Sequence, residues 1–334
     1  MKLSVIYSIY NRSDLFSRAL RSVYQQTMPK EDYELVVIDD GSTEPIKSRC
    51  LAPYKGKMNI RYIRYDRRLH PIYKEMNPTL YFPDEFAPTE SWPTLTSDEN
   101  WCHTQAISGN IGLQQSTGEI CLISQPEMIH MPDSFLSGYN RAKEGKMVFS
   151  EILHASEDFN GYLSAHPYAL KSNIESLWAI ANSYPKEYEL NHMPSQNFYE
   201  MYWYAAYFPR QSAINIGGID LRYQRGVYAE DDQFKVRMRL EGSVDTWGGR
   251  PNLEGSFNGY SGAIHQSHLK EKEIYKKQDR QSRWWDERAN HNRALWQDFQ
   301  HNPYVVANTD LDYSPWGEFL IKEDTKWPIS SLSK

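Results

Sequence analysis

Two short apolar runs, residues 3–9 and 33–38, flank a segment with helical periodicity. Both runs are rich in β-branched residues, as strands are, whereas apolar side chains recur every three or four residues between Leu15 and Tyr24. Ser13 stands where it could cap that helix. Because neighbouring strands joined by a helix run parallel, the pattern predicts a β-α-β unit at the start of the chain.

Strand and helix patterns continue to alternate along the chain. Further strands are expected at 59–65, 120–123 and 146–152, and further helices at 104–115, after Pro132, from Glu230 and across 270–300. Residues 66–101 are rich in proline and residues 158–209 in aromatic side chains, and we expect functional loops in both segments. In the first loop, Trp92 and Trp101 either contact a ligand or pack the loop onto the core. The pattern predicts an α/β protein with a mostly parallel sheet flanked by helices.

Composition narrows the class of protein and its partners. The chain has 334 residues, 40% of them hydrophobic, which is enough for a sizeable core. Its net charge is −6 and its basic residues are scattered, so we expect no nucleic-acid partner. Three widely spaced cysteines favour a reducing compartment over a disulfide framework. No signal peptide and no apolar run of about 18 residues is present, so we expect a cytoplasmic protein without a membrane span.

Polar side chains gather where the first two predicted strands end. They are Ser8, Tyr10, Asn11 and Arg12 after the first strand and Asp39 and Asp40 after the second. Ligands of open parallel sheets bind beyond the carboxyl ends of the strands. We therefore expect a ligand site at this edge.

Four sequence segments together resemble family 2 glycosyltransferases, which have the GT-A fold. They are SIYNRSD with VVIDDGSTE, GNIGLQQSTGEICLI leading into QPE and MPDSF, INIGGID, and YAEDDQFKVR, in the order of the family. The resemblance covers about residues 1–240. It implies a GT-A domain at 1–265, with a donor half at about 1–130 and an acceptor half at about 131–265, followed by a C-terminal helical extension at 266–334.

The resemblance implies a nucleotide-sugar donor at the strand ends. The residues implied to bind it are Ser8, Tyr10, Arg12, Asp39, Asp40, Asn110 and Gln125. A tyrosine ring can stack on a base and the Asp40 carboxylate can accept the imide N–H of uracil, so UDP is expected first and GDP second. Asp39 either assists or only shapes the turn. Arg12 either reaches a phosphate or remains a surface arginine.

The resemblance also implies a divalent cation, Mn²⁺ or Mg²⁺, at the end of the middle strand. The usual Asp-x-Asp is replaced by Gln125-Pro126-Glu127, so one carboxylate has become an amide. Such cations often use one or two carboxylates plus substrate phosphates, and Glu127 alone could suffice. His265 matches a late histidine ligand of the family, with His268 as its rival.

Asp231 is implied as the general base of a single inverting displacement, with Glu230 orienting its neighbours or the acceptor. The acceptor would be a hydroxyl of a glycan or another molecule, as in polysaccharide biosynthesis. Mutual repulsion among three adjacent carboxylates, Glu230, Asp231 and Asp232, should raise the pKa of at least one, which suits a base. The alternative reading is that these acids only complement the dipole of a helix N-terminus.

Two rival functions remain to be weighed. A catalytically inactive nucleotide-sugar binding protein is favoured by Gln125 and opposed by the intact Asp40 and Asp231. A sugar nucleotidyltransferase would need a glycine-rich phosphate loop after the first strand, and residues 10–13 contain no glycine. An oligomer is compatible with the sequence.

Overall fold

The computed structural model describes most of the N-terminal half and separate parts of the rest. The described residues are 1–66, 105–150, 152–166, 168–172, 176–184, 205–225, 229–242, 262–267 and 282–330. The predicted loop with Trp92 and Trp101, most of the aromatic segment before residue 205, and His268 lie outside them.

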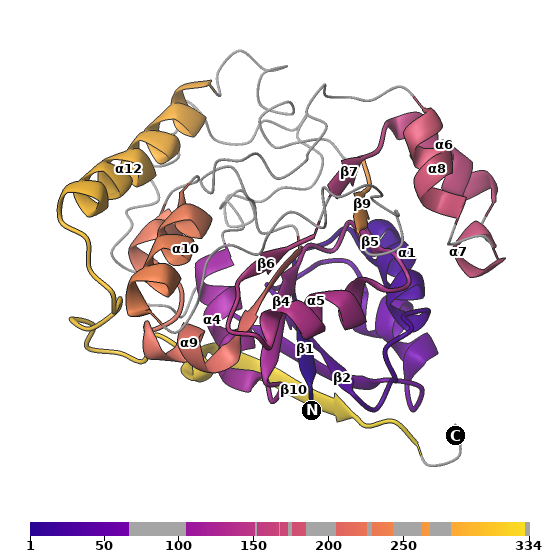
Figure 1. Cartoon of the computed structure of the whole chain (residues 1–334), viewed down its shortest axis with the longest axis horizontal. Coiled ribbons are helices and arrows are strands. Elements are labelled where there is room, and N and C mark those ends of the chain that lie inside the picture. The colour runs from indigo at the N-terminus through magenta and orange to yellow at the C-terminus, as the bar shows by residue number, and fades with distance from the viewer. Residues whose placement is uncertain are drawn as a thin grey trace.

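A seven-stranded sheet forms the centre of the molecule (Figure 1). Its order is β10-β3-β2-β1-β4-β8-β6. The bounds are β1 Leu3–Ile9, β2 Tyr33–Asp39, β3 Asn59–Tyr65, β4 Ile120–Ser124, β6 Val148–Phe149, β8 Ala205–Pro209 and β10 Ile321–Trp327. Strands β3, β2, β1 and β4 are parallel, whereas the outer strands run antiparallel to their neighbours. The predicted α/β class with a parallel central sheet is confirmed, and so is the first β-α-β unit.

Alternation along the central strands builds a core on each face of the sheet. Val5 and Tyr7 pack on one face with α1 (Ser13–Tyr24) and α5 (Ser134–Ala142). Ile6 packs on the other with α4 (Gln105–Gln115), α9 (Arg210–Asn215) and α10 (Glu230–Glu241). Successive strand residues point to opposite faces, which explains why the apolar runs are continuous rather than alternating.

A second sheet of three strands, in the order β5-β9-β7, lies at the upper end of the central sheet in Figure 1. Its strands are β5 Met128–His130, β9 Ala263–His265 and β7 Ile152–His154. Helices α6 (Glu157–Ala165), α7 (Ala169–Ser172) and α8 (Leu177–Ser183) lie beside it, and their apolar side chains form a third core. The prediction of one strand at 146–152 was therefore wrong, because β6 and β7 belong to different sheets.

The C-terminal segment contributes both a helix and a strand. Helix α12 (Ser282–His301) matches the expected helical run, but β10 pairs antiparallel with β3 at the edge of the central sheet. Arg61 on β3 makes a two-pronged ion pair with Asp324 on β10, at 3.0 and 2.7 Å. A purely helical extension was thus an incomplete prediction. No described helix is long and apolar enough to cross a lipid bilayer.

Candidate donor and catalytic site

The ends of β1 and β2 are joined by a turn that Asp39 organises. The Asp40 N–H donates to the Ile9 carbonyl at 2.9 Å, which continues the pairing of the two strands. One carboxylate oxygen of Asp39 accepts the Ser42 N–H at 2.7 Å, and the other accepts the Tyr62 hydroxyl at 2.6 Å. Asp39 is fully buried. Of the two roles left open for it, the geometry supports shaping the turn, which presents the neighbouring Asp40.

Asn11 and Arg12 adopt the left-handed backbone conformation, with φ of 56° and 61°. Each such residue costs about 1–2 kcal/mol, so the surrounding contacts must hold the pair in place. The Asn11 side-chain oxygen accepts N–H bonds from Thr43 and Glu44 at 2.9 and 3.1 Å. The Ser13 N–H at the start of α1 donates to the Glu44 carboxylate at 2.6 Å. Ser13 therefore lies inside the helix and does not cap it with its side chain, contrary to the prediction.

Arg12, Glu127 and His265 meet at the carboxyl ends of β1 and β4. The Arg12 Nη1 lies 3.1 Å from Glu127 Oε2, and the His265 Nε2 lies 3.5 Å from Glu127 Oε1. The Glu127 side chain is 4% exposed, whereas that of Arg12 is 34% exposed. Arg12 can therefore contact a ligand while its ion pair with the buried Glu127 fixes its position.

The pairing of β5 with β9 brings Glu127 and His265 together. Met128 lies opposite His265 in this antiparallel pair, and the Gln266 side chain donates to the Glu127 carbonyl at 3.0 Å. On the other side of β9, the ring of His154 lies 4.6 Å from that of His265. Nothing in the sequence around His154 marked it, since its neighbours are an ordinary apolar run.

Glu127 and His265 fit a divalent cation whose remaining ligands come from a substrate. Donor atoms that each lie about 2.1 Å from one ion cannot be more than about 4.2 Å apart, and these two are 3.5 Å apart. Among the described residues no three His, Cys, Asp or Glu side chains form a complete metal cage. A cation held here would thus need oxygens from a bound diphosphate.

The other residues implied to bind a donor differ in their placement. Ser8 lies buried near the end of β1 and shares a hydrogen bond with Ser108 of α4, while Tyr10 follows β1 and Gln125 follows β4, both partly exposed. Asn110 is fully buried, and its amide donates to the Ile219 carbonyl at 2.9 Å and accepts the Ile219 N–H at 2.7 Å. Asn110 thus holds the turn at Ile219, and its implied contact with a donor stays a prediction.

Helix α10 begins with the three predicted carboxylates, Glu230, Asp231 and Asp232. The pKa of Asp231 is raised to about 6, mainly by burial; the charge of Lys235 opposes the rise and that of Asp232 adds to it. Lys235, fully buried, pairs with Asp232 at 2.6 Å. Asp231 is partly exposed at the first turn of the helix. A carboxylate with a raised pKa and access to solvent can take a proton near neutral pH.

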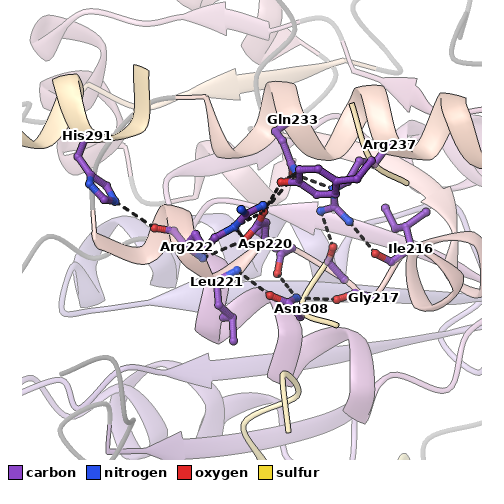
Figure 2. Close-up of polar contacts among 12 residues, drawn as sticks. Ile216, Gly217, Asp220, Leu221, Arg222, Gln233, Arg237, His291 and Asn308 are labelled. Carbon is purple, nitrogen blue, oxygen red and sulfur yellow. Dashed lines mark hydrogen bonds and ion pairs between the residues drawn. The ribbon is translucent and has the colours of Figure 1, made fainter. Parts of the chain in front are cut away.

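The Gly217-Gly218 turn is held by hydrogen bonds from three parts of the chain, and Figure 2 shows those from Arg237 and Asn308. Arg237 of α10 donates to the carbonyls of Ile216 and Gly218, both at 2.7 Å. Asn308 donates to the carbonyls of Gly217 and Ile219 at 2.8 and 2.9 Å, and Asn110 bonds Ile219 from α4. A Cβ at Gly218 would lie 2.4 Å from the Asn110 oxygen, and its φ is +72°. The tight turn predicted here requires its glycines.

We expect Gly218→Ala to destabilise the fold and loosen α10. The alanine Cβ would clash with the buried Asn110 amide, and the left-handed conformation would cost about 1–2 kcal/mol in addition. Thermal unfolding should show a lower melting temperature. Gly161→Ala on α6 is the control, because no atom lies within 4 Å of the added Cβ. Equal melting temperatures for the two variants would contradict the clash.

Comparisons with known proteins agree on one family. The model described as Glycosyl transferase family 2 matches residues 4–73. A poly(ribitol-phosphate) beta-glucosyltransferase of Bacillus spizizenii is 24% identical over 226 residues, which are 60% of this chain and 35% of that protein. A validoxylamine A glucosyltransferase of Streptomyces hygroscopicus subsp. jinggangensis is 39% identical over 61 residues, 18% of this chain and 14% of the other. The chain matches about a third or less of the length of these curated relatives.

Solved structures give weaker likenesses. Staphylococcus aureus TarS 1-349 in complex with UDP-GlcNAc has a TM-score of 0.48 and 14% identity, covering 91% of this chain and 77% of that one. The mannosyltransferase PcManGT of Pyrobaculum calidifontis, in complex with GDP-Man and Mn²⁺, has a TM-score of 0.44 and 16% identity, covering 83% and 59%. The sequence segments, the family model over residues 4–73 and the curated relatives together make this chain similar to glycosyl transferase family 2.

Proposed function

We propose that the protein transfers a sugar from a nucleotide-sugar donor, a UDP-sugar, to a hydroxyl of a glycan or another acceptor, with inversion at the anomeric carbon. The observation that carries this proposal is the meeting of Arg12, Glu127 and His265 at the strand ends that also carry Asp40. At this edge the Arg12 guanidinium could bind the diphosphate of a nucleotide, and Glu127 with His265 could hold a cation beside it. The Asp40 carboxylate could bind the nucleobase. The curated relatives named above are glucosyltransferases, which supports the same class of reaction.

In the proposed complex, Asp40 accepts an N–H of the uracil ring and the Tyr10 ring lies against the base. Asp40 is 3% exposed, so a hydrogen bond to its carboxylate would be shielded from water and strengthened. The guanidinium of Arg12, whose side chain is 34% exposed, contacts the diphosphate. A divalent cation held by Glu127 and His265 would supply further positive charge to the leaving diphosphate.

In the proposed chemical step, Asp231 removes the proton of the acceptor hydroxyl as its oxygen attacks the anomeric carbon. The new carbon–oxygen bond forms on the face opposite the leaving group, and the bond to the β-phosphate oxygen breaks. The electron pair of that bond leaves on the nucleoside diphosphate. The raised pKa of Asp231 suits this proton transfer, because a general base is most effective when its pKa lies near the working pH.

We expect UDP to stabilise the wild-type protein against heat, and Asp40→Asn to remove most of that effect. A ligand at 100 times its dissociation constant stabilises the folded state by about 2.7 kcal/mol, so a tenfold loss of affinity is readily seen. The measurement is a thermal shift across UDP, GDP and uridine, with and without Mn²⁺. Asp32→Asn, which alters a surface ion pair with Lys2, is the control.

A larger shift with GDP than with UDP would contradict the proposed donor. The inactive binding protein remains the second candidate, since an amide, Gln125, replaces one of the family's metal-binding carboxylates. Tight UDP binding without transfer from any UDP-sugar would favour that candidate.

A further inference from the structure

The start of α10 is not fixed by a cap of its own. Ala229 stands at the N-cap position with φ of 67°, and it offers no side-chain hydrogen bond to the helix. Side-chain caps contribute about 1 kcal/mol and define where a helix begins. Other contacts must therefore set the position of Glu230 and Asp231.

Those contacts come from one face of α10, through Gln233 and Arg237. The Arg237 Nε donates to Gln233 Oε1 at 2.8 Å, and its two terminal nitrogens bond the turn at 216–218. Arg237 is fully buried, so its position is tied to these acceptors. Figure 2 shows these hydrogen bonds, which join the helix to the turn.

Residues 302–308, which we call the C-terminal strap, hold this turn in place. The Ala307 N–H donates to the Ile216 carbonyl at 3.0 Å, and the side chain of Asn308 bonds the carbonyls of Gly217 and Ile219 and the Leu221 N–H. Asn308 itself has φ of 61°. The strap and α4 therefore both hold the turn, since Asn308 and Asn110 donate to the same Ile219 carbonyl.

Tyr304 of the strap connects α10 directly to Asp220. Its hydroxyl donates to the Asp220 carboxylate and accepts the Gln233 side-chain N–H at 2.5 Å. Arg222 holds the same carboxylate at 2.7 Å and lies over the Tyr304 ring at 5.0 Å, while Phe299 of α12 packs against that ring. Asp220 is 1% exposed, so its charge is neutralised entirely within this group.

From this arrangement we infer that the C-terminal strap is a positioning element for the general base, with Tyr304 and Asn308 as its positioning residues. The inference rests on the proposed function, since it assumes that Asp231 takes the acceptor proton. The strap lies outside the segments that resemble the family and outside the matched residues 4–73. It acts on the transfer step through α10, since its hydrogen bonds run to Gln233 of α10 and to the turn and Asp220 beside it.

We expect Tyr304→Phe to lower kcat about tenfold while the UDP dissociation constant and the donor KM stay within twofold. The phenylalanine keeps the ring contacts with Phe299 and Arg222 but removes the hydroxyl that bridges Asp220 and Gln233, so that only their direct contact at 3.4 Å is left. Misplacing a catalytic group by a fraction of an ångström reduces rate strongly without changing ground-state binding. Asn308→Gly should act similarly, because glycine adopts a positive φ without strain and only the side-chain bonds are lost.

The matched control is Tyr139→Phe on α5, which also removes a tyrosine hydrogen bond, here an exposed one to Glu119, but changes no residue of α10 or the strap. Hydrogen exchange across 229–237 gives a readout independent of turnover, and it should quicken about tenfold in Tyr304→Phe and not in Tyr139→Phe. An unchanged kcat or a parallel loss of UDP affinity in Tyr304→Phe would overturn the inference. If the wild-type protein itself transfers no sugar, the proposed function fails, and unchanged exchange in α10 would then separately refute the strap.

Discussion

Asp231→Asn should reduce kcat by about 10³-fold or more and leave the thermal shift with UDP unchanged. General bases contribute about 10²–10⁴-fold to rate, and asparagine matches aspartate in shape but cannot accept the proton. The donor residues lie at the ends of β1, β2 and β4, on other elements than α10. The measurement is transfer from a UDP-sugar at saturating donor, alongside the UDP thermal shift.

Asp14→Asn is the matched control for this substitution. Asp14 occupies the second position of α1, as Asp231 does in α10, but its side chain is 70% exposed and pairs with Arg49 at the surface. If Asp231 only complemented the helix dipole, the two substitutions would have similarly small effects on turnover. Retention of more than about a third of the wild-type kcat by Asp231→Asn would refute Asp231 as the base, with Glu230→Gln the variant to test next.

The raised pKa of Asp231 also predicts how turnover and stability of the wild-type protein and of Asp231→Asn depend on pH. Because Asp231 must be ionised to act, the kcat of the wild-type protein should rise through pH 6 and level off above it. Between about pH 4 and 6 the folded state binds more protons at this group than the unfolded state, so the stability contributed by Asp231 falls as pH rises. Asp231→Asn should therefore raise the melting temperature at pH 7, with the gain disappearing toward pH 4.

Local patterns predicted the centre of the fold well. Strands β1, β2 and β4 are largely apolar runs because both faces are buried, β3 alternates apolar residues with arginines, and α1 carries one apolar stripe, so each could be read from its own residues. Strand β10 escaped prediction because its exposed positions are charged and alternate with only partly buried residues, as is typical of an edge strand. Its register depends on cross-strand ion pairs such as Arg61–Asp324, which become evident only once the two strands are paired.

The site was predictable where its residues follow one another in the chain. Asp39 and Asp40 lie at the end of a strand, and Glu230 and Asp231 begin a helix, so their places in the fold could be predicted from the sequence. The pairing of β5 with β9, two strands of three residues each, was not, because such short segments carry little periodicity. The contact between Arg12 and Glu127 depends on two left-handed residues that no local preference requires, and the link from Tyr304 to α10 spans more than seventy residues.

Glu127→Gln should abolish the contribution of Mn²⁺ to UDP affinity, a loss of about 30-fold in the presence of the metal. Hard cations bind carboxylate oxygens far better than a neutral amide, and Gln125 already supplies an amide at the neighbouring family position. The substitution keeps the size of the side chain and an oxygen that can accept from Arg12. Calorimetric titration of UDP with Mn²⁺, and separately with a chelator, measures the two affinities.

The substitution should weaken UDP binding with Mn²⁺ but not with the chelator. With the chelator, Glu127→Gln should bind UDP at least as tightly as the wild-type protein, because Arg12 loses the charged partner that competes with the diphosphate. Glu119→Gln is the control, since Glu119 precedes the same strand at its other end and is exposed. A Mn²⁺-dependent gain in Glu127→Gln equal to that of the wild-type protein would remove Glu127 from the cation site. Arg12 would then remain as the diphosphate-facing positive charge that Glu127 orients.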